Sequence, residues 1–489
     1  MKNRKPIVII GAGPAGMGAA IEAARAGASC ILIDEGRFPG GQVYRKNSKE
    51  FQVKEKEMLT AEQKRGKKLH EELEEVSDKI KILTSTSVLG VWKNREVMWS
   101  SNDASGVIEA EQIIIATGAY ERPVPFPGWT LPGVMTVGGV KSFIKTMFIK
   151  PGETALIAGT GPLLISTANK LHDIGVNVLA VLEAGSPSWA SPDFINQWGD
   201  ADFAHDIAAD LLELKQNNIP ILFNHTVFKI NGKDEAESVT YGALNPENWK
   251  PLEDTTKTVN ADLVALGFGF VPNTELTELA ECKHEFYPGI GWTVIRDEWM
   301  QTSQQGIFAV GDGARISGAI IAEEEGRIAG IKAAQNCEAI QAVDAEKRSE
   351  KYFSRIHSFE KFRKHLNEVT SVKSGLLELA THKTLVCRCE EVRLSDVDKA
   401  ITEGAGDLQS VKLLTRLGMG ACQGKNCSPS MGMYLCEKLN KTAYQVGRIN
   451  PRPPVKPVTL GALANMTITK DSHQNDSYDA INTGGYYEK

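Results

Sequence analysis

The sequence predicts an α/β protein with two Rossmann-like domains, the second inserted in the first, and a small helical domain after them. Three observations support this: a strand–glycine turn–helix–strand unit at residues 7–34, a similar unit at 155–183, and two cysteine pairs near the C-terminus. The strand-to-glycine pattern of residues 113–118 recurs at 261–267, which indicates an internal repeat. We expect the first domain at 1–122 and 276–340, the second at 123–275, a helical connector at 341–380, the cysteine domain at 381–450 and an extended or disordered tail at 451–489.

Composition and charge narrow the function classes. Of the 489 residues, 42% are hydrophobic and 24% are charged, as is usual for globular domains. The formal net charge of -6 gives no reason to expect nucleic acid or an anionic membrane as a partner. No stretch reaches the roughly 18 consecutive apolar residues of a membrane-spanning helix. We expect a cytoplasmic protein without an integral membrane segment; a peripheral position at the inner face of the membrane is the alternative.

The first unit contains the parts of a dinucleotide-binding fingerprint. An apolar strand leads into the turn at residues 11–16 (GAGPAG), an alanine-rich helix follows, and the next strand ends in Asp34. Gly11 permits the tight turn, Gly13 lets the backbone approach a pyrophosphate, and Gly16 lets helix and strand pack closely. The helix N-terminus favours phosphate, and Asp34 suits a ribose diol. Further expected contacts of the nucleotide are Pro14, Ala15, Glu35, Gly41 and Gln42.

Two later strands also end in glycine-containing turns. The strand at residues 113–115 ends in Ala116-Thr117-Gly118, and the one at 308–310 ends in Gly311-Asp312. A carboxylate between glycines just after a strand suits a ribityl hydroxyl, although an Asp in an ordinary turn would look the same. The helix at 319–334, which includes Ala322, would direct its N-terminal amides toward the pyrimidine end of a flavin. These residues predict FAD at the first fingerprint.

The second unit has a degenerate fingerprint. Gly159 and Gly161 are present, but Leu164 stands at the third glycine position, and Glu183 ends the following strand. Leucine at that position leaves less room for a pyrophosphate. A site for NAD or ATP and a purely structural role both remain open for this domain.

The cysteine pattern predicts a metal centre. Cys387 and Cys389 are separated by one residue, and Cys422 and Cys427 follow after a 32-residue interval, with four residues between them. Four thiolates can hold a [2Fe–2S] cluster or a zinc ion. Structural zinc usually has two to four residues between paired cysteines, so the pattern favours the cluster over zinc or a vestigial site. A disulfide framework is not expected in a reducing compartment.

These motifs resemble known families. The first fingerprint with Asp34, Ala116–Gly118 and Gly311-Asp312 resembles the FAD-dependent pyridine-nucleotide oxidoreductase superfamily over residues 1–340. The redox cysteine pair of its disulfide reductases is missing. The four cysteines resemble the bacterioferritin-associated-ferredoxin-like [2Fe–2S] domain over residues 381–440.

The order of these parts, and the stretch 116–142, resemble the alpha subunit of heteromeric FAD-dependent amino-acid dehydrogenases and oxidases. That group includes D-hydroxyproline, proline and opine dehydrogenases, hydrogen cyanide synthase and, more distantly, sarcosine oxidase. The resemblance implies a D-amino-acid-oxidase-like beta subunit that bears its own FAD, with room for FMN at the interface between the two and for a small additional subunit.

The function implied is electron transfer from the partner through flavin and cluster to an acceptor, in the oxidation of an amino or imino acid. No catalytic residue is assigned, because no Ser/His/Asp set, paired carboxylates or histidine base is evident. The main alternative is a stand-alone NAD(P)H-dependent reductase that feeds the cluster. A non-catalytic assembly subunit is the third.

Overall fold

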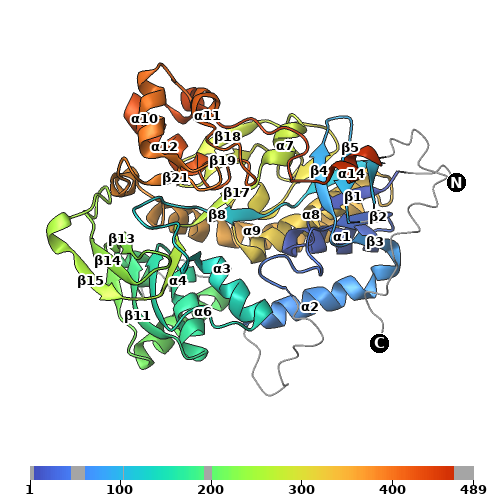
Figure 1. Cartoon of the computed structure of the whole chain (residues 1–489). Coiled ribbons are helices and arrows are strands. Elements are labelled where there is room, and N and C mark those ends of the chain that lie inside the picture. The colour runs from blue at the N-terminus through green and yellow to red at the C-terminus, as the bar shows by residue number, and fades with distance from the viewer. Residues whose placement is uncertain (1–4, 46–60, 103, 192–200, 467–489) are drawn as a thin grey trace.

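The computed structural model describes residues 5–45, 61–102, 104–191 and 201–466 of the chain (Figure 1). Two five-stranded parallel sheets form its centre, and each is packed between helices and a three-stranded antiparallel sheet. The predicted α/β fold with Rossmann-like units is therefore present.

The first sheet has the strand order β20-β7-β1-β2-β3 and is parallel throughout. Its central strands are short apolar runs that are buried on both faces, as is usual in parallel sheets. Its strands are β1 (Ile7–Ile10), β2 (Cys30–Ile33), β3 (Ile80–Leu83), β7 (Gln112–Ile115) and β20 (Ile307–Ala309).

Helices α1 (Pro14–Arg25), α2 (Ala61–Glu75) and α8 (Ala319–Asn336) cover one face of the first sheet. Helices α1 and α8 pack closely: a Cβ atom on Gly326 of α8 would lie 1.9 Å from the carbonyl oxygen of Ala15. The opposite face is covered by an antiparallel sheet of β4 (Ser87–Val91), β5 (Glu96–Ser100) and β6 (Ser105–Glu109).

The second sheet has the order β12-β11-β10-β16-β9 and is also parallel. All of its strands lie between β7 and β20 in the chain, so this sheet is inserted into the first. One face carries α3 (Val137–Ser142), a π-helical turn (Phe143–Met147), α4 (Leu163–Asp173) and α6 (Ala201–Gln216); the other carries β13 (His225–Asn231), β14 (Ser238–Ala243) and β15 (Lys257–Asn260). Its strands are β9 (Val134–Thr136), β10 (Thr154–Gly159), β11 (Asn177–Glu183), β12 (Ile221–Phe223) and β16 (Leu263–Gly267).

Two chain crossings join the parts that contain the two sheets. Strand β8 (Ala119–Glu121) leaves the first sheet after β7, and β17 (Phe270–Pro272) follows β16 and pairs with β8 in antiparallel register. Helix α7 (Glu275–Leu279) and the hairpin of β18 (His284–Tyr287) and β19 (Gly291–Val294) then lead back toward β20.

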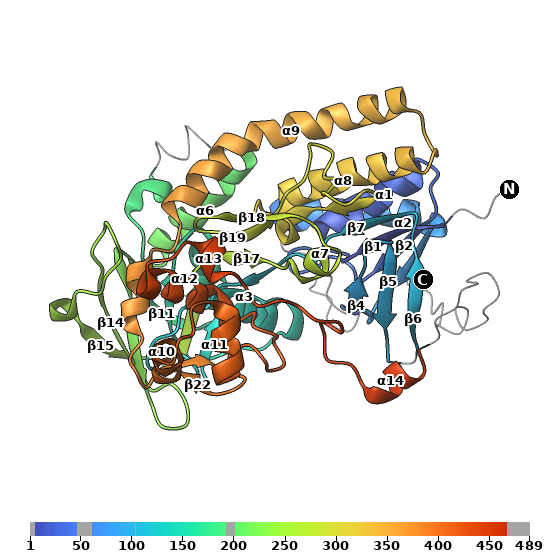
Figure 2. The same cartoon turned by 90° about the horizontal axis from the view of Figure 1, so that it is seen from above.

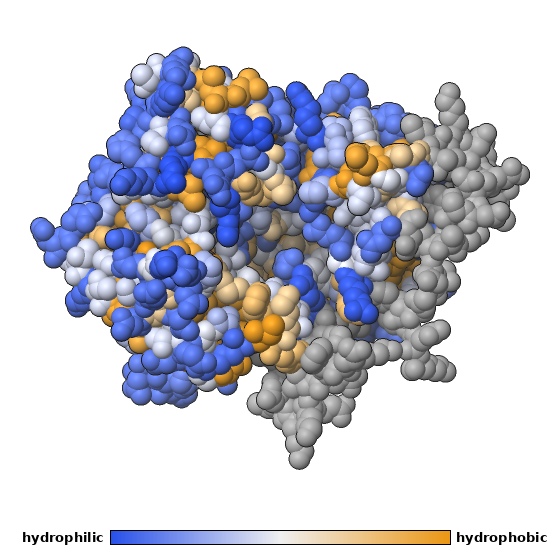
Figure 3. All heavy atoms as spheres, viewed as in Figure 1, coloured by the Kyte–Doolittle hydropathy of each residue, from blue (hydrophilic) through white to orange (hydrophobic). Residues whose placement is uncertain are grey.

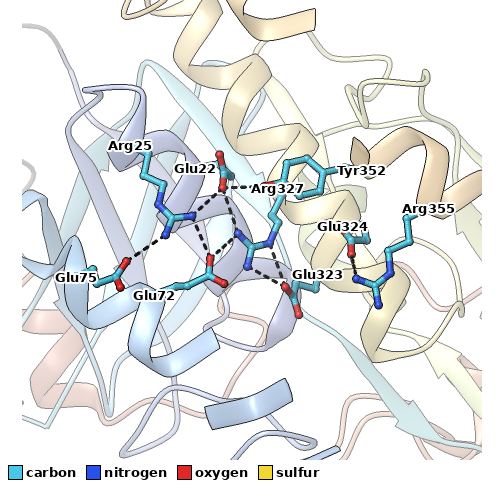
Figure 4. Close-up of polar contacts among 9 residues, drawn as sticks. All are labelled: Glu22, Arg25, Glu72, Glu75, Glu323, Glu324, Arg327, Tyr352 and Arg355. Atoms are coloured by element: carbon cyan, nitrogen blue, oxygen red, sulfur yellow. Dashed lines mark hydrogen bonds and ion pairs between the residues drawn. The ribbon is translucent and has the colours of Figure 1, made fainter. Parts of the chain in front are cut away.

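Helix α9 (Ala342–Val369) lies within the range 341–380, where a connector is expected, and runs along α8 before it reaches the second sheet (Figure 2). Its first half joins an ion-pair network centred on Arg327 (Figure 4). Arg327 contacts Glu22, Glu72 and Glu323 at 3.1, 3.0 and 2.9 Å, and the Tyr352 hydroxyl of α9 donates to Glu22. The network ties α1, α2, α8 and α9 together.

The cysteine region folds as a small module with its own apolar core. From its end the chain returns to the first domain: the Val455 amide bonds the Leu89 carbonyl oxygen of β4, and Ser105 bonds the carbonyl oxygen of Ala462. The described part of the expected tail is thus an extended segment with one short helix, and residues 467–489 lie outside the described residues. The module and tail contain β21 (Leu385–Cys387), β22 (Val392–Arg393), α10 (Leu394–Thr402), α11 (Leu408–Thr415), α12 (Ser428–Leu439), α13 (Ala443–Val446) and α14 (Leu460–Ala464).

Hydrophilic side chains dominate the face shown in Figure 3, with hydrophobic ones in small patches around a central hollow. Within the described ranges, no helix has both the length and the apolar character needed to span a bilayer.

Candidate cofactor sites

The first glycine loop lies between β1 and α1, and two of its positions have room for no residue other than glycine. A Cβ atom on Gly11, which has a φ of 99°, would lie 2.3 Å from the Ala116 carbonyl oxygen. A Cβ on Gly16 would lie 1.7 Å from the carbonyl oxygen of Gly11. Gly41 approaches from the side, with its own Cβ position 2.7 Å from the Cα of Gly13. These contacts leave no room for side chains, as expected of a glycine loop whose backbone approaches a pyrophosphate.

The parallel sheet brings the predicted residues of the first site to one edge. Asp34 follows β2, Ala116–Gly118 follow β7, and Gly311-Asp312 follow β20, all at carboxyl ends of strands. The Thr117 hydroxyl donates to the Asn273 carbonyl oxygen at 2.8 Å, which anchors this turn to the chain returning from the second sheet. Ligands of open α/β sheets bind at this edge.

Asp34 supports the loop through its carboxylate. One oxygen accepts the Ala12 amide at 2.5 Å and the other accepts the Gly36 amide at 2.7 Å. Burial raises the pKa of Asp34, and these two hydrogen bonds oppose the shift. Of its predicted neighbours, Glu35 pairs with Lys456 of the C-terminal segment at 2.6 Å. Gln42 is exposed and accepts a hydrogen bond from Arg45.

Asp312 closes the turn that leads into α8. Its Oδ1 atom accepts the amides of Ser317 and Gly318 at 2.7 and 2.8 Å, and burial raises its pKa. Ala322, in the first turns of α8, packs against Gly311: a Cβ there would lie 3.0 Å from the Ala322 methyl. The α8 N-terminus and Asp312 thus form one compact turn at the sheet edge.

A further charged residue lies at this turn that no sequence motif indicated. Arg363, from α9, donates through Nε to the Ser317 carbonyl oxygen at 2.8 Å. The connector reads as a charged amphipathic helix, and nothing in its pattern separates Arg363 from its exposed neighbours. Only the packing of α9 against both domains places it here.

Glu183 braces the second glycine loop in the same way as Asp34 braces the first. Glu183 is fully buried, with its oxygens accepting the amides of Gly161 and Gly185 at 2.8 and 2.7 Å. Burial raises the pKa of Glu183 to about 7. Gly159 contacts the neighbouring strand, since a Cβ there would lie 1.9 Å from the Gly267 carbonyl oxygen.

Two further features cover that loop. Leu164 is buried and lies against Gly267, where a Cβ would be 2.9 Å from the leucine methyl. The end of α9 lies over the glycines: the Thr370 methyl is 3.6 Å from the Cβ position of Gly161, and the Val369 carbonyl oxygen is 3.5 Å from that of Gly185. A ribose that used Glu183 as its partner would have to displace these groups.

The four predicted cysteines lie together in the loops of the C-terminal module. Cys387 and Cys427 are buried, Cys389 is exposed and Cys422 is half-buried. A hydrogen bond with Cys427 lowers the pKa of Cys387 to about 5, with help from the backbone amides of Gly418, Glu390 and Cys389. Cys389 forms the second pair with Cys422. The hydrogen bond with Cys387 and burial raise the pKa of Cys427, and the charges of the other three cysteines add to the shift, as expected if the two pairs share one site.

The chemistry of these donors fits a thiolate-bound centre. Sulfurs that are approached by backbone amides are typical of iron–sulfur ligands. However, among the described residues no group of three or more His, Cys, Asp or Glu side chains is arranged to hold one metal ion. The two loops approach so closely that a Cβ on Gly420 would lie 2.4 Å from the Cβ of Cys389, so only glycine fits there.

A cavity of about 440 Å³ lies beside this module. Residues of β8, β17, β19, α12 and the segment at residues 446–455 line it. Arg122 lines it and is 7% exposed, with its guanidinium bound to the carbonyl oxygens of Gly289 and Ile290 at 3.0 and 2.8 Å. Lys425, from the loop between Cys422 and Cys427, also lines the cavity. Lys425 is paired with Glu275, which also lines the cavity, whereas Arg122 is bound to carbonyl oxygens alone. The aromatic walls (Tyr120, Phe286, Trp292) suit a planar ligand, and Arg122 suits an anionic group on it.

Comparison with known proteins shows which families this chain resembles. The family model described as pyridine nucleotide-disulphide oxidoreductase matches residues 5–337, and the sarcosine oxidase A3 domain matches residues 381–466. Hydrogen cyanide synthase subunit HcnB of Pseudomonas aeruginosa is 34% identical over 466 residues, which cover 95% of this chain and 99% of that protein. The A subunit of opine oxidase from Rhizobium meliloti is 32% identical over 476 residues, with 95% and 88% covered.

Among solved structures, the L-proline dehydrogenase of P. horikoshii has a TM-score of 0.67 and 21% identity, covering 94% of this chain and 79% of that chain. This likeness confirms the fold. The first match spans well over half of the chain, and the relatives above are aligned over almost all of it. The chain therefore belongs to the pyridine nucleotide-disulphide oxidoreductase family and is an oxidoreductase.

Proposed function

We propose that the chain is the electron-transfer subunit of a heteromeric dehydrogenase that oxidises an amino or imino acid of the proline, hydroxyproline or opine class. Electrons from the partner subunit would pass through flavin and a [2Fe–2S] centre to an acceptor. The observation that carries the proposal is the combination, in one chain, of an FAD-type glycine loop and four neighbouring cysteines. The relatives named as subunits of hydrogen cyanide synthase and opine oxidase support it.

The first site would hold FAD through the loop at residues 11–16, Asp34 and Asp312. Both carboxylates accept backbone amides, a role that shapes the turns and leaves neither poised as a proton donor. A bound FAD supplies two-electron chemistry, and a [2Fe–2S] cluster held by Cys387, Cys389, Cys422 and Cys427 supplies one-electron transfer. Thiolate ligands are most easily maintained in the cytoplasm.

The cavity beside the cysteine module is our candidate for the FMN expected at a subunit interface. Arg122 is suited to its phosphate, because it is buried and bonded to carbonyl oxygens rather than to a carboxylate among the described residues. The D-amino-acid-oxidase-like partner, with or without a small additional subunit, would then dock over this cavity.

A cysteine substitution tests the route. Cys422→Ser should leave reduction of the flavin by the partner's substrate intact but prevent onward transfer to the acceptor. Cys337→Ser is the matched control, since Cys337 is half-buried at the C-terminal end of α8, outside the module and the cavity lining. Equal turnover with the natural acceptor in wild type and Cys422→Ser would contradict the proposal.

The stand-alone reductase is tested separately, because buried Leu164 and the end of α9, which lies over the second glycine loop, argue against nicotinamide binding there. Anaerobic NADH should not bleach the flavin of the purified chain; rapid bleaching would favour that alternative. Co-purification with the product of a neighbouring gene tests the partner. A colourless protein, without flavin or cluster absorbance, would instead indicate an assembly subunit.

A further inference from the structure

One guanidinium from helix α9 lies at the N-terminus of α8. Arg363 donates to the Ser317 carbonyl oxygen, and its terminal nitrogen lies so near Gly318 that a Cβ there would be only 2.3 Å away. Gly318 precedes the first residue of α8, and its amide donates to Asp312. Arg363 therefore faces the same turn that Asp312 closes, at the carboxyl edge of the first sheet.

This placement is electrostatically costly in the isolated chain. A helix N-terminus carries partial positive charge, so a cation beside it is disfavoured. Burial lowers the pKa of Arg363, and the charge of Asp312 opposes the shift. No ion pair joins Arg363 to a carboxylate in the part of the chain that the structure describes, and Asp312 uses Oδ1 for two amides. The charge of Asp312 balances that of Arg363, so the partial positive charge of the α8 N-terminus is what a further anion at this turn would balance.

The position of Arg363 is fixed from both sides. Earlier along α9, Tyr352 and Arg355 bond Glu22 and Glu324 of the first domain (Figure 4). On either side of Arg363 in the sequence, Phe362 and Leu366 are buried in the core of the second domain. A side chain held by a helix anchored in two cores keeps its geometry better than one on a free surface.

We propose that Arg363 is an electrostatic partner of the FAD ring and stabilises the negative charge that reduction places on N1 and the C2 carbonyl. This inference rests on the proposed binding of FAD at the first loop. Uptake of two electrons and one proton leaves the ring with one negative charge, and the electrons come from the substrate oxidised by the partner. The guanidinium and the α8 N-terminus meet where the pyrimidine end of the flavin is expected, so both favour the reduced form.

The midpoint potential of bound FAD tests the proposal. Removing the charge in Arg363→Met should weaken binding of reduced relative to oxidised FAD by about tenfold, which for a two-electron couple lowers the potential by about 30 mV. Arg363→Lys keeps the charge and should stay close to wild type. Lys364→Met removes the same charge from an exposed neighbour on α9 and should leave the potential unchanged.

The outcomes separate the two proposals. If wild type contains FAD and Arg363→Met has the same midpoint potential as wild type, the role of Arg363 is wrong while FAD binding stands. The same conclusion follows if Lys364→Met lowers the potential as much as Arg363→Met does. If wild type contains adenine nucleotide without flavin and Arg363→Met gains FAD, the guanidinium occupies the place of the ring, and both proposals fail. If Arg363→Met does not fold, a normal potential in Arg363→Lys supports the charge and a lowered one contradicts it.

Discussion

Arg327 at the centre of the network in Figure 4 offers a quantitative test of how the first domain is held together. Its side chain is 6% exposed and contacts the carboxylates of Glu22, Glu72 and Glu323 within 3.1 Å. Arg327→Met would leave these carboxylates in a desolvated site. Removing one partner of a buried ion pair costs about 3–5 kcal/mol. Arg25 still reaches Glu22 and Glu72, so we expect the lower end, about 3 kcal/mol.

Thermal unfolding followed by circular dichroism measures this loss. For a domain of this size, about 3 kcal/mol corresponds to a fall in Tm of roughly 6–12 °C. Lys93→Met is the control: it breaks an exposed pair with Glu281, for which about 1 kcal/mol or less is expected.

The pH dependence of the Tm loss shows whether it arises from the ionised carboxylates around Arg327. Burial opposes ionisation of Glu72, but Arg327 outweighs it and holds the pKa of Glu72 below its ordinary value. A carboxyl group with a lowered folded pKa contributes stability above its unfolded pKa, and this contribution is lost as pH falls through the folded value. The Tm difference between wild type and Arg327→Met should therefore be steady from pH 7 to about pH 5 and narrow as pH falls below the ordinary glutamate pKa of 4.5. A difference below that of Lys93→Met, or one that is constant with pH, would refute the reasoning.

Three further predictions address the sites. Gly16→Ala should give protein without bound FAD, because its Cβ meets the Gly11 carbonyl oxygen, while Gly461→Ala, with open space around it, should bind normally; flavin absorbance after gel filtration distinguishes them. Burial, with Arg448 adding to it, lowers the pKa of His284 to about 3, so wild type should lose stability as pH falls below about 6.5. His284→Gln should lose less over the same range in thermal melts, and parallel curves would contradict this. Arg122→Met should release FMN from the assembled enzyme. An unchanged FMN content would show that the cavity is not the FMN site.

The sequence predicted the parts of the molecule that depend on local pattern. The loop at residues 11–16 and the turns after β7 and β20 were assigned because glycine and apolar runs follow from backbone geometry over a few residues. The parallel sheet then brings Asp34 and Asp312 to one edge as a consequence of strand order. The inserted second sheet was predicted for the same reason, from the repeat of one strand-to-glycine pattern.

Features that depend on packing between distant segments were not predicted. Glu183 was interpreted as a possible ribose ligand, and nothing in the local pattern indicated that the end of α9, nearly two hundred residues later, would lie over the same glycine loop. Arg363 looks like any charged residue of an amphipathic helix until α9 is docked on both domains. The cavity with Arg122 is built from segments that no local pattern connects.

Reductive titration of the purified chain under anaerobic conditions tests the central claim most directly. The claim is that one chain holds FAD at the first loop and a [2Fe–2S] centre at the four cysteines. We predict that wild type shows flavin and cluster absorbance and takes up one electron more per chain than Cys422→Ser, which keeps the flavin bands alone. Equal electron uptake by the two proteins, or wild type without flavin absorbance, would contradict the account.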